Sequence, residues 1–96
     1  MKAERGGREG QRFGNYRLVR LIGSGAFADV YLGEHLYLKT PVAIKVLQTN
    51  VASKDAREGF LKEAQTIARL IHPNIVRITD FGVEKKIPFL VMDCLL

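Results

Sequence analysis

Apolar and polar residues alternate along much of the first half of the chain, with the two-residue period of a half-buried β-strand. One alternating stretch spans Tyr16–Ile22 and leads into a glycine-rich segment, and a second spans Val30–Leu36. A third run, Val42–Leu47, follows Pro41 and is apolar on both faces apart from Lys45. This pattern predicts three successive strands, with the glycines in the connection between the first two.

A helical period replaces the strand period after Ser53, whose side chain suits the N-cap of a helix. Asp55 lies in the first turn, where the helix dipole favours an acidic side chain. At about 100° per residue, one face of this helix collects Phe60, Ala64, Ile67, Ala68 and Ile71. Glu63 falls inside this apolar arc. The pattern predicts one long helix over residues 53–71, ended by Pro73.

The strand period returns towards the end of the chain. Ile75–Thr79 alternates and predicts a fourth strand, and Ile87–Met92, with Pro88 near its start, predicts a fifth. Between them, residues 80–82 (Asp-Phe-Gly) are expected to form a turn in which Gly82 is the bend. The chain is thus expected to contain five strands and one long helix.

Two charged residues lie where the pattern predicts apolar surroundings. Lys45 interrupts an apolar strand, and Glu63 interrupts the apolar face of the helix. Burying an unpaired charge is costly, so an ion pair between these two side chains would satisfy both. Alternatively, Lys45 extends outward to water and Glu63 lies at the rim of the helix face. The spacing alone leaves both interpretations open.

Composition indicates one small folded domain. The 96 residues suffice for a modest core, and 47% hydrophobic with 26% charged residues is a balance typical of folded proteins. The sequence has neither a run of about 18 apolar residues nor an apolar segment near Met1, so it predicts no membrane span and no secretory signal. A cytoplasmic location is expected. The single cysteine, Cys94, has no partner for an internal disulfide.

The net charge of +5 comes partly from residues 1–12, which hold four basic and two acidic side chains. Because this end shows no apolar period, residues 1–15 are interpreted as a flexible basic leader and residues 16–96 as the folded domain. The domain lacks a dense basic stripe interleaved with aromatic residues. Nucleic acid is therefore not expected as a partner.

The glycine-rich segment Ile22–Val30 has a spacing that two classes of nucleotide-binding protein use. Glycines let the backbone turn tightly and bring its N–H groups close to a phosphate. In the dinucleotide-binding fold this turn opens a helix, and a carboxylate follows about 20 residues later. Here a strand follows the glycines, and neither Asp nor Glu lies between Glu34 and Asp55. The dinucleotide-binding interpretation is therefore rejected.

The order of strand, glycine turn, strand and lysine-bearing strand resembles the small lobe of a eukaryotic-type serine/threonine protein kinase, of the kind also found in bacteria. The motifs that carry this resemblance are Gly23, Gly25, Ala28 and Val30 in G-x-G-x-x-A-x-V, Val42–Lys45 as V-A-I-K, Glu63 in the helix, His72–Val76 as H-P-N-I-V, and Leu90–Asp93 as L-V-M-D. The resemblance covers Tyr16–Leu96 and implies a small lobe truncated at the hinge. It also implies an α+β fold, a five-stranded antiparallel sheet with one long helix.

The resemblance implies a role for each motif. Lys45 and Glu63 are the expected catalytic residues, because Lys45 would hold the α- and β-phosphates of ATP and Glu63 would hold Lys45. The backbone of the glycine turn would cap the phosphates. Met92 is the expected gatekeeper behind the adenine, and the carbonyl of Asp93 and the N–H of Leu95 would contact the adenine edge. The full set expected to bind ATP is Ile22, Gly23, Ser24, Gly25, Ala26, Phe27, Ala28, Val30, Ala43, Lys45, Met92, Asp93 and Leu95.

Magnesium is expected only in the complete enzyme, because the metal ligands of similar kinases are not in this chain. Residues 80–82 spell D-F-G, but they precede the hinge, whereas the metal-binding copy of this motif follows the catalytic loop. The chain is therefore expected to be inactive alone, to bind ATP weakly, and to reach a protein substrate through the missing large lobe. The alternative is a catalytically inactive kinase-like module that binds or regulates a partner.

Overall fold

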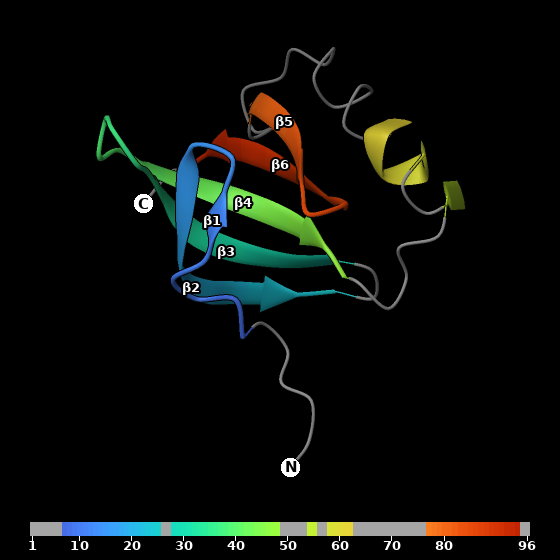
Figure 1. The fold of residues 1–96 in the computed structure, drawn as a ribbon, viewed down its shortest axis with the longest axis horizontal. Coiled ribbons are helices and arrows are strands. Elements are labelled where there is room, and N and C mark those ends of the chain that lie inside the picture. The colour runs from blue at the N-terminus through green and yellow to red at the C-terminus, as the bar shows by residue number, and fades with distance from the viewer. Residues whose placement is uncertain (1–6, 26–27, 49–53, 56–57, 63–76, 95–96) are drawn as a thin grey trace.

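The computed structural model of the chain describes residues 7–25, 28–48, 54–55, 58–62 and 77–94. Within these ranges, six strands form one sheet (Figure 1). Residues 54–55 and 58–62 are helical. The strands are β1 (Arg12–Phe13), β2 (Tyr16–Ser24), β3 (Ala28–His35), β4 (Pro41–Leu47), β5 (Ile78–Glu84) and β6 (Ile87–Asp93).

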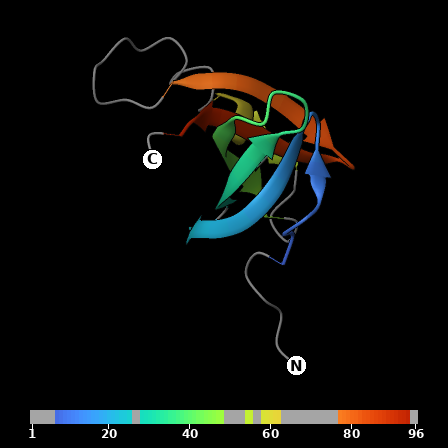
Figure 2. The ribbon, with the colours of Figure 1, turned by 90° about the vertical axis from the view of Figure 1, so that its left-hand side faces the viewer.

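All neighbouring strands are antiparallel, in the order β1-β2-β3-β4-β6-β5. The two edge strands approach each other in space. The N–H of Gly14 donates to Oε1 of Glu84 at 3.0 Å, and the hydroxyl of Tyr16 donates to Oδ2 of Asp80 at 3.2 Å. The sheet is therefore strongly coiled, with a concave inner face and an outer face (Figure 2).

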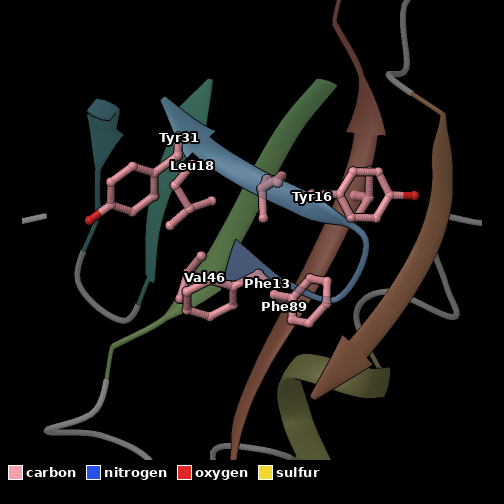
Figure 3. Packing of buried hydrophobic residues seen from close by; sticks show 8 residues of the cluster. Phe13, Tyr16, Leu18, Tyr31, Val46 and Phe89 are labelled. Atoms are coloured by element: carbon pink, nitrogen blue, oxygen red, sulfur yellow. The ribbon is translucent and has the colours of Figure 1, made fainter. Parts of the chain in front are cut away.

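The inner face holds the larger core cluster. Alternate residues of β2, β3, β4 and β6 point inward and exclude water from one another, as the two-residue period requires. Phe13 of β1 closes this cluster and meets Phe89 edge to face, with ring centroids 5.5 Å apart (Figure 3). The buried members are Phe13, Tyr16, Leu18, Tyr31, Ile44, Val46, Phe89 and Val91.

The outer face holds a second, smaller cluster where the helical residues meet the sheet. Phe60 from the helix packs with Leu47 and Leu90, and its ring lies 6.4 Å from that of Phe81. Ala28 completes the buried part of the cluster. Phe60 thus packs the described helical residues against one part of the outer face.

The sheet has six strands, and the expectation of five is wrong. The additional strand, β1, lies within the segment 1–15 that the sequence analysis assigns to a leader. Phe13 is only 2% exposed. A strand of two residues cannot show a hydrophobic period, and the pairing of Phe13 with Tyr16 follows a tight turn at Gly14, whose φ is +59°. The division into residues 1–15 and 16–96 stays a prediction.

The expected turn at residues 80–82 is also wrong, because these residues lie inside β5. The turn lies instead at Lys85 and Lys86, with φ of +51° and +69°. Hairpin turns with two positive φ values usually contain Asn or Gly, so two lysines give no turn signal. Gly82 serves packing: a Cβ there would lie 2.6 Å from Cζ of Phe89.

The described helix is short rather than long. It comprises residues 54–55 and 58–62, and the remaining part of the expected helix, residues 63–71, lies outside the described residues. Residues 75–76 also lie outside the described residues, so the expected fourth strand is described only from Ile78 onward. No described helix is long and apolar enough to cross a membrane.

Candidate functional site

Lys45 lies at the centre of the sheet, between Val30 of β3 and Leu90 of β6. Residues that face each other across antiparallel strands project their side chains to the same side. Lys45 alternates with Ile44 and Val46, which belong to the inner core. Its side chain therefore projects from the outer face, where it is half-buried. The expected strand Val42–Leu47 is confirmed within β4 (Pro41–Leu47).

The outer face beside Lys45 is apolar. Ala43 lies between Leu32 of β3 and Met92 of β6 in the register, and all three side chains are half-buried. Val30, next to Lys45, is half-buried too. Val30, Leu32, Ala43 and Met92 thus form an apolar strip on the outer face, with the small side chain of Ala43 at its centre. Such a surface suits a flat aromatic ring, because burying the ring removes apolar area from water on both sides.

The glycine turn and the end of β6 lie at opposite ends of this strip (Figure 1). Val42 pairs with Asp93 three positions before Lys45, and Leu47 pairs with Ala28 two positions after it. A strand rises about 3.3–3.4 Å per residue. Measured along β4, Lys45 therefore lies about 10 Å from the position opposite the end of β6 and about 7 Å from the position opposite the end of the turn. The lysine is therefore nearer to the turn.

The glycine turn joins β2 to β3. Gly23 pairs with Val30 and Ser24 with Asp29, and the N–H of Gly25 donates to the carbonyl of Ala28 at 2.8 Å. The register of β2 shifts between Leu21 and Gly23, and Ile22, within this irregularity, is 44% exposed. Both Ser24 and Gly25 are exposed as well. The start of the turn thus presents backbone to solvent.

Several residues expected in the site lie outside the described residues, namely Glu63, Ala26, Phe27 and Leu95. The ion pair from Lys45 to Glu63 therefore stays a prediction. At the other end of the strip, Asp93 closes β6, and its N–H donates to the carbonyl of Arg77 at 3.0 Å. Its side chain is exposed.

Asp80, the first residue of the D-F-G tripeptide, is held by neighbours in the sheet. Its Oδ2 accepts from the hydroxyl of Tyr16, and its Oδ1 accepts from the N–H of Phe81 at 2.8 Å. Burial raises the pKa of Tyr16, and the charge of Asp80 and the hydrogen bond to it act in the same direction. Within the described ranges, His, Cys, Asp and Glu side chains form no group of three that could hold a metal ion.

One pair near the turn was missed by the sequence analysis. Nε2 of Gln48 donates to the carbonyl of Gly25 at 3.1 Å and to Oδ1 of Asp29 at 3.0 Å. Both polar side chains are buried. The available signal was weak: an acid inside the glycine segment and an amide directly after an apolar strand. Neither residue has a fixed identity in the motifs used above.

Comparison with known sequences gives a consistent result. Residues 16–96 match the family described as the protein kinase domain. The serine/threonine-protein kinase PrkC of Bacillus subtilis (strain 168) is 43% identical over 81 residues, which are 83% of this chain and 12% of that protein. The serine/threonine-protein kinase pkn2 of Myxococcus xanthus is 42% identical over 81 residues, 83% of this chain and 10% of that protein. The chain thus spans only a small part of these relatives.

Solved structures give the same fold. The PknI kinase domain of Mycobacterium tuberculosis matches with a TM-score of 0.69 at 33% identity, over 90% of this chain and 35% of that chain. The apo form of PpkA-294 matches with a TM-score of 0.74 at 24% identity, over 90% of this chain and 37% of that chain, which shows the fold alone.

Proposed function

Since this chain belongs to the protein kinase domain family, we propose that it is the ATP-binding small lobe of a serine/threonine kinase. In the complete enzyme, this lobe positions Mg-ATP for transfer of the γ-phosphoryl group to a hydroxyl of a protein substrate. The family assignment confirms the resemblance from which the sequence analysis drew this function. The protein substrate is reached through the large lobe.

The observation that supports ATP binding most directly is the placement of Lys45. The strand register places Lys45 on the outer face beside Val30, and Ala28, where the glycine turn ends, lies about 7 Å further along the sheet. A cation close to a glycine turn attracts phosphate. The inner face, by contrast, is filled by the core cluster.

The apolar strip supplies the place for the adenine. Val30, Ala43 and Met92 present half-buried apolar side chains next to the main chain that ends β6 at Asp93. An aromatic base packs against such side chains, while backbone polar groups at its edge give specificity. The residues of this face therefore fit a purine nucleotide with its phosphates directed towards the glycine turn.

Bound Mg-ATP supplies the phosphoryl group, and the chain supplies position and charge. Lys45 offsets the negative charge of the α- and β-phosphates, and N–H groups of the turn add further donors. Glu63, in the segment after the described helix, would orient Lys45. The metal ligands and the residue that accepts the substrate proton belong to the large lobe.

The test is nucleotide binding by the chain and by two variants that lose the same charge. Lys45→Met removes the cation from the site, and Lys85→Met removes one from the exposed turn between β5 and β6. We expect weak ATP binding by the chain, at least a tenfold loss with Lys45→Met, and an unchanged affinity with Lys85→Met, measured by calorimetry. Equal affinities of the two variants would contradict the proposal.

A further inference from the structure

Gln48 and Asp29 form a buried polar pair at the base of the glycine turn. Gln48 is 9% exposed and Asp29 is 6% exposed, although side chains of these types usually lie at the protein surface. The amide of Gln48 makes two hydrogen bonds, to Oδ1 of Asp29 and to the carbonyl of Gly25. One amide group therefore connects three segments, which are the end of β4, the start of β3 and the turn itself.

The pair lies on the side of the sheet opposite to Lys45. Asp29 is level with Val46 in the register, and Val46 belongs to the inner core. Because side chains alternate along β4, Gln48 follows Val46 to the inner side while Lys45 points outward. A nucleotide on the outer face would thus not compete with Gln48 for the carbonyl of Gly25.

The bond to Gly25 gives the buried amide of Gln48 a second acceptor. The NH2 group has two donor hydrogens, and it donates to Oδ1 of Asp29 and to the carbonyl of Gly25. The bond to Gly25 also restrains the backbone where Ser24 and Gly25 are exposed. Glycine loses more conformational entropy than other residues when it is ordered, so a restraint here lowers the entropy cost of ordering the turn around a ligand.

We propose that Gln48 is a positioning residue that anchors the glycine turn to β4, the strand that carries Lys45. The anchor sets the place of the turn relative to the lysine before a nucleotide binds. Gln48 acts through Gly25 and does not itself contact the ligand. The identification of that ligand as ATP rests on the proposed function, whereas the anchor can be measured without any ligand.

Two variants test the anchor. Gln48→Met keeps the length of the side chain and removes both donor hydrogens. Thr79→Val is the matched control, because it removes a side-chain hydrogen bond to a backbone carbonyl, that of Val91 at 3.3 Å, on the distant β5–β6 pair. Hydrogen exchange of each backbone amide, measured by NMR without nucleotide, and ATP affinity are the two readouts.

Gln48→Met is expected to speed exchange of the Gly25 amide about tenfold relative to the amides of β4, and to weaken ATP binding by roughly three- to tenfold. Thr79→Val is expected to change neither quantity. Unchanged exchange at Gly25 in Gln48→Met would overturn the anchor, as would an equal acceleration at every amide of the sheet. So would an unchanged ATP affinity in a chain that binds ATP. If the unaltered chain binds no ATP, the proposed function fails, but the exchange at Gly25 still decides whether Gln48 anchors the turn.

Discussion

Phe89 of β6 packs its ring onto Gly82, the residue directly opposite on β5. A Cβ on Gly82 would lie 2.6 Å from Cζ and 2.9 Å from Cε1 of that ring. The same ring meets Phe13 edge to face. The missing side chain of Gly82 therefore makes room for the aromatic contact that joins β6 to β1, and the last letter of the D-F-G tripeptide has a packing role in this chain.

Gly82→Ala should lower the free energy of unfolding by about 1–3 kcal/mol, because the added methyl group overfills the core or displaces Phe89. Gly59→Ala is the matched control in the helical residues, where an added Cβ meets nothing within 4 Å. That change should be neutral or stabilise by up to about 1 kcal/mol, since Ala favours helix over Gly. Urea unfolding of both variants measures the difference, and equal stabilities would contradict the packing role.

Phe13→Ala should destabilise the chain by about 3–5 kcal/mol if β1 is part of the folded domain. Val19→Ala, on neighbouring β2, is the control, because Val19 is 44% exposed and its truncation should cost less than about 1 kcal/mol. Thermal unfolding followed by circular dichroism compares the two. A Phe13→Ala protein as stable as Val19→Ala would mean that the domain begins after β1.

Asp80→Ala separates a structural aspartate from a metal-binding one. Its carboxylate accepts hydrogen bonds from Tyr16 and from the N–H of Phe81. Loss of these bonds should lower stability by about 1–2 kcal/mol while leaving the affinity for Mg-ATP unchanged. Calorimetric titration with and without magnesium gives the affinity. A variant that loses only the magnesium-dependent part of binding would show that Asp80 acts on the metal.

Tyr16 makes stability depend on pH at the alkaline end. Its pKa is raised from 10.0, first by burial and then by Asp80, so the folded state holds the phenolic proton more tightly than the unfolded state. This contribution is fully present below pH 10 and is lost as pH rises through the raised pKa. The stability difference between the unaltered chain and Tyr16→Phe should therefore shrink from about pH 8 to about pH 11.

Urea titrations of both proteins at these two pH values measure that difference. Tyr31, whose pKa burial also raises, is present in both proteins, so its titration cancels in the comparison. A difference that stays constant or grows with pH would show that the hydroxyl of Tyr16 is not protected in the folded state.

The elements with a clear hydrophobic period were predictable. Tyr16–Ile22, Val30–Leu36 and Val42–Leu47 lie within or close to β2, β3 and β4, and Ile87–Met92 lies within β6. The face from which Lys45 projects was not predictable, because Val42–Leu47 is apolar on both faces and only the structure shows that Ile44 and Val46 belong to the inner core.

The parts that were missed depend on contacts between residues far apart in sequence. β1 has two residues, and β5 is an edge strand in which apolar and polar residues do not alternate regularly, so neither shows a period along its full length. The turn at Lys85 and Lys86 uses positive φ values that lysine seldom adopts. The anchor from Gln48 to Gly25 links residues 23 positions apart, and no local pattern contains it.

The most direct test of the account maps ATP binding onto the sheet by NMR. If the outer face binds the nucleotide, adding ATP should progressively change the chemical shifts of the backbone amides of Val30, Ala43, Lys45 and Met92. The Lys45→Met variant should need at least tenfold more ATP for the same changes. The chemical shifts of amides beside the inner core, such as those of Phe13 and Gly14, should not change. Shifts confined to Phe13, Gly14 and Glu84, or none at all at millimolar ATP, would contradict the assignment of this face as the nucleotide site.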